Sequence, residues 1–217
     1  MKQILFFVPI FFLILETPQS QSVKKSPDLL LYLCGGVKLL APKHFGHDVN
    51  ISPNSVPTIG GGAIWQLNKF QFGGEFNFTD GKKQATDFGT IFTGINFNLI
   101  AGYRYILTNK IRLGFQTGFG YGLSHLSVTD KHFTGSPKLN TAIYHNLIYT
   151  VPLALTIQRI SSNGILFEIQ GGYHFNVIPN EWRYMKGSST EIYTGGIDGF
   201  FVKLVVGGLL KLNKTAP

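Results

Sequence analysis

The sequence predicts an all-β fold, an eight-stranded antiparallel up-and-down β-barrel that spans a membrane. Segments with one apolar face and one polar face recur along the 217 residues, as they do in barrel strands. Connections of about 3 residues alternate with connections of about 10 to 20 residues, which puts the tight turns on one rim and the long loops on the other. Beyond its first residues the chain has no uninterrupted apolar run of the ~20 residues that a membrane-spanning helix needs. We therefore expect strands to cross the membrane.

Residues 1–22 have the features of a secretory signal peptide. Lys2 gives a positive start, residues 4–15 form an apolar run, and the small residues Ser20 and Ser22 fit a cleavage site. The rest of the chain, residues 23–217, is then a single barrel domain. A single cysteine excludes an internal disulfide.

Alternation of apolar and polar residues justifies each strand in turn. Ile95 and Phe97, for example, lie on one face of their segment, and Asn96 and Asn98 lie on the other. This pattern marks residues 29–40, 57–68, 70–79, 90–107, 111–123, 146–158, 165–177 and 199–212. Short links are expected at residues 68–70, 108–110 and 160–164, and long loops at residues 41–56, 80–89, 128–143 and 178–198. Pro152 falls inside a strand, where its missing amide donor requires a bulge or a local break in pairing.

The composition of the polar faces decides which face points inward. A secreted lipocalin-like barrel would enclose a ligand with its apolar faces, whereas a membrane barrel turns them to lipid. The polar faces here contain many Gly, Asn and Gln and only isolated charges, which suits a narrow hydrated interior. We therefore favour the membrane barrel, with a soluble lipocalin-like ligand-binding barrel as an alternative.

An interior enclosed by eight strands is just wide enough for its own side chains. Six charged residues fall on the inward faces: Lys38, Glu75, Arg104, Arg112, Glu168 and Lys203. We expect them to form an internal ion-pair network that plugs the lumen. A narrow path for ions is the alternative, and the excess of cationic groups would then favour anions.

Two strands carry a resemblance to a known family. Residues 149–153 (YTVPL) and 168–175 (EIQGGYHF), with the signal peptide and the Gly-aromatic strands, resemble the small PorT-like outer-membrane β-barrel proteins of Bacteroidetes. The resemblance covers about residues 27–212 and implies a bacterial outer-membrane barrel domain of mostly unassigned function. In that membrane the short-turn rim is periplasmic, so both termini are expected in the periplasm and the long loops outside the cell.

One tripeptide, His125-Leu126-Ser127, has an enzymatic pattern. His125 and Ser127 are both expected to point outward at the loop end of their strand, where a His can activate a Ser toward a lipid ester. The pair resembles the His-x-Ser of the PagL-type lipid A deacylases, also eight-stranded outer-membrane barrels, and this implies lipid A 3-O-deacylation. That family orients its His with a carboxylate about a dozen residues after the Ser, but residues 137–141 hold no acid, and Asp130 is the nearest substitute. We therefore expect a protein that is not an enzyme, with the deacylase as the alternative.

The longest expected loop, residues 178–198, contains the side chains most typical of recognition surfaces. Trp182, Arg183, Tyr184 and Tyr193 stand there among polar residues. Aromatic and Arg side chains are the usual anchors of binding, so this loop is the expected binding site for an extracellular ligand or protein partner. The alternative is an anchor at the level of the lipid headgroups.

The net charge of +8 is spread over the N-terminal stretch and the long connections, without the basic stripe of a nucleic-acid-binding protein. We expect no cofactor and no metal, because His44 and His47 lie near Asp48 but lack a second pair of ligands. The expected surroundings are outer-membrane lipid and lipopolysaccharide, and the barrel is expected to be a monomer. The sequence thus predicts an outer-membrane protein with a structural or surface-binding role.

Overall fold

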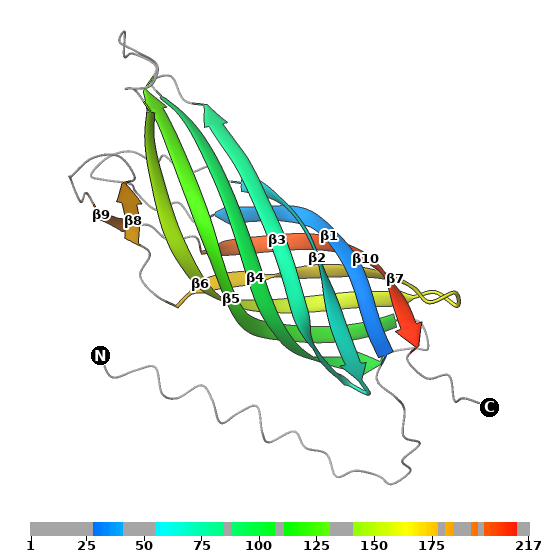
Figure 1. Ribbon diagram of the computed structural model, residues 1–217. Coiled ribbons are helices and arrows are strands. Elements are labelled where there is room, and N and C mark those ends of the chain that lie inside the picture. The colour runs from blue at the N-terminus through cyan, green and yellow to red at the C-terminus, as the bar shows by residue number, and fades with distance from the viewer. Residues whose placement is uncertain are drawn as a thin grey trace, which may run out of the picture.

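The computed structural model contains eight long strands and one short hairpin (Figure 1). It describes residues 28–40, 55–84, 88–106, 111–130, 141–177, 181–184, 192–194 and 198–211. The long strands are β1 (Asp28–Leu40), β2 (Ser55–Leu67), β3 (Phe70–Gln84), β4 (Phe88–Ile106), β5 (Ile111–Asp130), β6 (Thr141–Ile160), β7 (Ile165–Asn176) and β10 (Gly199–Lys211). The hairpin consists of β8 (Glu181–Tyr184) and β9 (Ile192–Thr194). No helix among the described residues is long and apolar enough to cross a membrane.

The eight long strands close into an antiparallel barrel, because β10 pairs with β1 as well as with β7. A row of paired residues that starts at Asp28 runs once around the barrel and returns to β1 at Lys38, ten residues along. Such a large offset means that the strands are strongly tilted against the barrel axis. We call the end at which β1 begins and β10 ends the short-turn end, and the opposite end the loop end.

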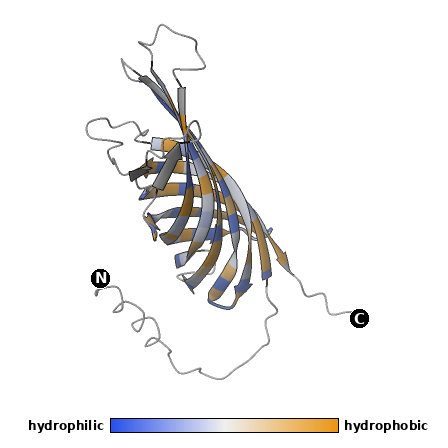
Figure 2. Cartoon of the chain, turned by 60° about the vertical axis from the view of Figure 1, so that its left-hand side comes forward, coloured by the Kyte–Doolittle hydropathy of each residue, from blue (hydrophilic) through white to orange (hydrophobic). Residues whose placement is uncertain are grey.

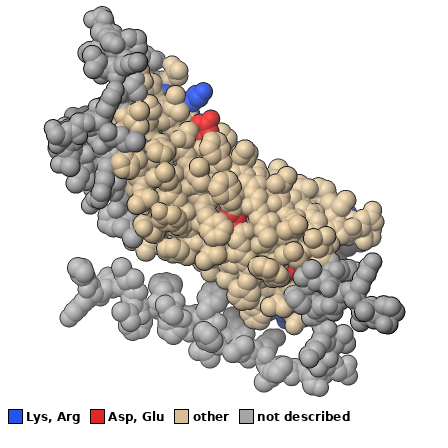
Figure 3. All heavy atoms as spheres, in the orientation of Figure 1, with Lys and Arg blue, Asp and Glu red and all other residues tan. Residues whose placement is uncertain are grey.

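The apolar faces of the strands point outward and the polar faces point inward, as predicted. On β10, for example, Val202 and Leu204 are exposed and Lys203 is buried. Hydrophobic and hydrophilic residues alternate along the strands in Figure 2, and few charged atoms reach the part of the wall seen in Figure 3. This facing is the reverse of what the lipocalin-like alternative requires.

The wall of the barrel has unequal height. Strands β3 to β6 rise well above the others at the loop end in Figure 1. The expected long loop at residues 80–89 is therefore wrong, since β3 continues to Gln84 and β4 begins at Phe88. Polar residues such as Lys82 and Lys83 hide this extension from a reading of the sequence, because they end the alternation of apolar and polar residues.

The segment expected as a loop at residues 178–198 contains the hairpin β8–β9. It pairs with the upper part of β6, where Tyr144 lies opposite Tyr184 and His145 opposite Arg183. The partner strand β7 reaches β6 only as far as the pair between Asn176 and Thr150, which leaves the upper edge of β6 unpaired by β7. The hairpin covers that edge.

Pro152 interrupts the ladder between β5 and β6. Pairing runs up to Thr117 opposite Leu153 and resumes at Gly120 opposite Thr150 in the same register. No residue is inserted, so the missing amide produces a local break in pairing and not a bulge. Of the two predicted possibilities, a bulge or a local break in pairing, the break is confirmed.

The short turns use residues that suit them. Asn68, between β2 and β3, has a φ of 53°, a conformation that Asn tolerates better than most residues. Gly164 precedes β7 with a φ of 80°, and its carbonyl accepts the amide of Leu209 at 3.0 Å. This bond ties the turn to the end of β10.

Candidate functional site

The lumen contains an apolar cluster near each end and two polar groups. The cluster near the loop end consists of Leu40, Val56, Phe92, Leu126 and Ile148, with Val128 and Tyr144 packed against it. The cluster near the short-turn end consists of Leu30, Tyr32, Cys34, Ile64, Leu166 and Val205, with Ile160 and Leu209 against it. We call them the upper and the lower cluster. The lumen also contains two buried carboxylates, Glu75 and Glu168, and Glu168 pairs with Val205 of the lower cluster.

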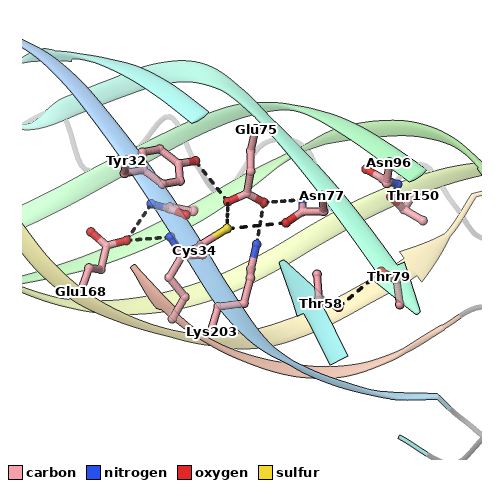
Figure 4. Close-up of polar contacts among 12 residues, drawn as sticks. Tyr32, Cys34, Thr58, Glu75, Asn77, Thr79, Asn96, Thr150, Glu168 and Lys203 are labelled. Carbon is pink, nitrogen blue, oxygen red and sulfur yellow. Dashed lines mark hydrogen bonds and ion pairs between the residues drawn. The ribbon is translucent and has the colours of Figure 1, made fainter. Parts of the chain in front are cut away.

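Glu75 on β3 is the centre of the first polar group (Figure 4). Its Oε1 accepts Lys203 Nζ at 2.5 Å and Asn77 Nδ2 at 2.7 Å. Its Oε2 accepts the Tyr32 hydroxyl at 3.1 Å and lies 4.0 Å from Cys34 Sγ. Glu75 is only 2 % exposed, so this buried charge is compensated by one cation and by neutral donors.

Glycines on the inner face let these partners reach Glu75 from strands that do not pair with β3. Lys203 on β10 pairs with Gly36 on β1, and a Cβ at Gly36 would lie 2.9 Å from Lys203 Cγ. Gly62 on β2 pairs with both Tyr32 and Glu75. The inward glycines are therefore the gaps through which the long side chains pass.

Glu168 on β7 is the centre of the second polar group. Its Oε2 accepts Arg104 from β4 at 3.1 Å and Gln158 at 2.9 Å. Its Oε1 accepts Gln170 at 2.7 Å and Gln116 at 3.4 Å. Arg104 also donates to Gln158 Oε1 at 2.6 Å, so the cation, the carboxylate and the amide form a closed ring of bonds.

The structure brings four of the six predicted lumen charges together, as the pairs Glu75–Lys203 and Arg104–Glu168. Lys38 and Arg112 lie elsewhere. Arg112 is half-buried near the short-turn end, where Asp28 attracts it electrostatically. Lys38 lies above Glu75, lining a cavity with Lys203.

The residues that complete the two polar groups were not singled out from the sequence. They are Tyr32, Cys34, Asn77, Gln116, Gln158 and Gln170. Each lies at one of the alternate positions of its strand that point inward, and this alternation is the sequence signal that could have identified it. The offset between neighbouring strands determines which inward residues meet across the lumen, and the alternation within a single strand does not reveal that offset.

His125 and Ser127 lie on the outer face of β5 toward the loop end, as predicted. His125 pairs with Thr93 on β4 and with His145 on β6. Among the described side chains no hydrogen bond joins His125 to Ser127, and none joins His125 to a carboxylate. The side chain of Asp130, the proposed substitute acid, lies outside the described residues.

The predicted binding residues fall within the hairpin. Trp182, Arg183 and Tyr184 belong to β8, Tyr193 belongs to β9, and Trp182 pairs with Tyr193. Their side chains lie outside the described residues, as do His44, His47 and Asp48. Within the described part of the chain no three His, Cys, Asp or Glu side chains come together as metal ligands.

The sequence matches no family model and no curated protein. The structure, however, is similar to solved structures. Neisserial surface protein A aligns with 85 % of this chain and 97 % of its own, at a TM-score of 0.53 and 10 % sequence identity. A major outer membrane protein from Thermus thermophilus aligns with 84 % of this chain and 99 % of its own, at a TM-score of 0.56 and 8 % identity. At this level of identity the likeness concerns the fold, and the fold of this chain is the closed eight-stranded antiparallel β-barrel.

Proposed function

We propose that this protein is a bacterial outer-membrane β-barrel with a plugged lumen, which serves a structural or surface-binding role through its loop end. The observation that carries the proposal is the pattern of the outer surface. Aromatic side chains form two partial rings on the outer surface, with an aliphatic band between them. Membrane barrels have this arrangement, because aromatic rings favour the two membrane–water interfaces and aliphatic chains favour the hydrocarbon.

The ring near the short-turn end consists of Trp65, Phe70, Phe72, Tyr103, Tyr105 and Phe167. The ring nearer the loop end consists of Phe78, Phe119, Tyr121, Tyr149, Tyr173, Phe175 and Phe200. Neighbouring aromatic side chains within each group are in contact. The ring centres lie 5.4 Å apart for Phe70 and Tyr103 and 5.3 Å apart for Tyr121 and Tyr149. The band between includes Leu33, Leu99, Leu155 and Leu204, each more than half exposed.

The interior supports a barrel that does not conduct solutes. Each buried carboxylate is bonded to a cation from across the lumen, and an apolar cluster packs near each end. Opening a path would require both ion pairs to separate in a site poor in water, which costs several kcal/mol for each ion. The role of the protein is therefore expected at its outer end and not in its lumen.

The same proposal gives the chain an orientation. Strand β1 begins and β10 ends at the short-turn end, which faces the periplasm in bacterial outer-membrane barrels. The tall wall of β3 to β6 and the hairpin β8–β9 then project from the cell surface, next to lipopolysaccharide and within reach of an extracellular ligand or protein. The resemblance of the sequence to PorT-like barrels supports this location.

Cell fractionation and conductance test the proposal. The protein is expected in the outer-membrane fraction, soluble only in detergent, with an electrophoretic mobility that changes on heating. In planar bilayers it should give no steady single-channel steps under conditions in which a porin conducts. A protein that is soluble without detergent would overturn the location, and steady steps would overturn the plugged lumen.

Thiol labelling of intact cells tests the orientation. Ser162→Cys places a thiol in an exposed short turn, and Lys82→Cys places one at the upper, exposed part of β3. A membrane-impermeant maleimide should label the second variant and leave the first unlabelled until the cells are broken. The wild type is the control, since its Cys34 is buried. The reverse labelling pattern would contradict the orientation.

A further inference from the structure

The lumen contains a cavity, lined by both apolar and polar side chains, between the Glu75–Lys203 pair and the upper apolar cluster. Its volume is about 40 Å³, and its wall includes Lys38, Lys203 and the hydroxyls of Thr58, Thr79, Ser124 and Thr150. Four residues of its wall, Thr58, Thr79, Asn96 and Thr150, are labelled in Figure 4, where they lie to one side of Glu75. The two polar groups described above do not use this space.

Lys38 is a buried charge that the described part of the barrel leaves without a bonded partner. Its side chain is 8 % exposed and lines the cavity, yet no hydrogen bond or ion pair joins it to any described residue. Asp198 attracts it electrostatically without forming an ion pair, and the Asp198 carboxylate accepts the amide of Asn176 at 2.6 Å. A buried ammonium group with none of its three donors bonded is costly, so a ligand there would be strongly favoured.

The rest of the cavity wall offers hydroxyl groups with free protons, together with one buried acceptor that has no described partner, Asn96 Oδ1. Thr58 and Thr79 share one hydrogen bond of 3.3 Å, which uses one of their two hydroxyl protons and leaves the other free. The Thr150 hydroxyl accepts Asn96 Nδ2 at 3.5 Å and keeps its own proton free. Ser124 Oγ is buried without a described partner.

We propose that this cavity is a binding site for one monovalent anion of halide size, held by Lys38 Nζ and the surrounding hydroxyl groups. The charge of the ligand follows from the wall, because Lys203 is already neutralised by Glu75, whereas Lys38 in its protonated form has no bonded anion among the described residues. The size follows from the volume. A water molecule needs about 10–15 Å³ of such space, so the cavity holds a halide with one or two waters, and a lipid headgroup or a sugar does not fit.

Crystallography with bromide tests the site directly. The full chain is refolded and crystallised in sodium bromide, and anomalous scattering locates the bromide ions. A peak inside the barrel at hydrogen-bonding distance from Lys38 Nζ is expected for the wild type. Only water at that position, in a well-folded barrel, would overturn the proposal.

Thermal unfolding in solution tests whether the site binds outside a crystal. Chloride is compared with gluconate, an anion too large for the cavity, at equal ionic strength. The unfolding temperature of the wild type should be several degrees higher in chloride and rise with chloride concentration. Lys38→Met should lose this dependence, while Lys69→Met, which removes the same charge from an exposed turn, should keep it.

The outcomes separate the possibilities. The same chloride dependence in all three proteins would mean a general salt effect and would overturn the site. If Lys38→Met does not fold, the bromide map and the chloride dependence of the wild type decide alone, since both are measured without the variant. A bromide peak without any chloride dependence would mean binding at crystal concentration only, and it too would overturn the proposal.

Discussion

The Tyr32 hydroxyl donates to Glu75 Oε2 at 3.1 Å across a strand that lies between them. Tyr32 is on β1 and Glu75 on β3, and the residue between, Gly62 on β2, pairs with both. A side chain at position 62 would occupy the path of the tyrosine ring. The hydrogen bond between Tyr32 and Glu75 thus depends on the absence of a Cβ atom at position 62.

Gly62→Ala tests this dependence. The added Cβ would lie 2.6 Å from Tyr32 Oη and 2.5 Å from Gly74 O, so the ring or the backbone must move. We expect the free energy of unfolding in detergent to fall by about 1–3 kcal/mol, the usual cost of overpacking. Gly171→Ala is the control, because nothing lies within 4 Å of its added Cβ. Equal effects of the two substitutions would show that the space above Gly62 does not matter.

A double-mutant cycle on the first polar group measures its ion pair. Glu75→Gln and Lys203→Met should each lower the free energy of unfolding by about 3–5 kcal/mol, because each leaves a buried partner uncompensated. The double variant should lose clearly less than the sum. The matched cycle combines Glu75→Gln with Arg104→Met, whose partner is Glu168, and should be closer to additive. Additivity in the first cycle would contradict a coupled pair.

Leu204→Arg tests the lipid-facing wall. Leu204 is 61 % exposed in the middle of β10, and a charge at the bilayer midplane of a barrel costs about 2–4 kcal/mol. Urea unfolding from lipid vesicles should show this loss. Ser162→Arg, in an exposed turn, should change the stability little. A variant at position 204 that is as stable as the wild type would argue against a wall in contact with lipid.

Deleting residues 181–193 tests the role of the hairpin. The hairpin joins the barrel through the upper part of β6, and the eight long strands close without it. We expect the deletion to keep the heat-dependent shift in mobility and to abolish any binding at the cell surface. Loss of the shift would mean that the hairpin is needed for folding.

Ser127→Ala tests the alternative of lipid A deacylation. No described carboxylate orients His125, so the non-enzymatic role predicts that lipid A keeps the same acyl chains with the wild type, the variant or no protein at all. Mass spectrometry of lipid A from the three strains makes the comparison. A deacylated lipid A that appears with the wild type and disappears with Ser127→Ala would establish the enzyme instead.

Much of the barrel could be predicted from the sequence, because an apolar outer face and a narrow polar lumen impose a strict period of two. That period placed Glu75, Arg104, Glu168 and Lys203 inside and Leu204 outside. It failed at the upper end of β3, where polar residues occupy both faces and the alternation ends. It also missed the hairpin. The hairpin pairs with the upper part of β6, which β7 leaves unpaired because β7 ends below it.

The partners within the lumen were harder to predict than the lumen itself. Arg104 and Glu168 are separated by two strands, and Gln158 lies between them in the same ring of bonds. The two-residue period predicts which face of the strand each residue occupies, but it does not predict how far along the barrel axis the residue lies. The position along the axis depends on the offset between paired strands that accumulates around the closed barrel, and this offset is a property of all eight strands together.

The seam between β1 and β10 has a consequence for the order of folding. Lys203 belongs to the last strand and Glu75 to the third, 128 residues apart in the chain. Until the last strand docks, Glu75 has no cation beside it, so a nearly complete barrel would still carry an uncompensated charge inside. Closure of the ring and neutralisation of Glu75 are then one event. Contacts between residues so far apart form slowly, so the ion pair between Glu75 and the last strand is completed only at the final step of assembly.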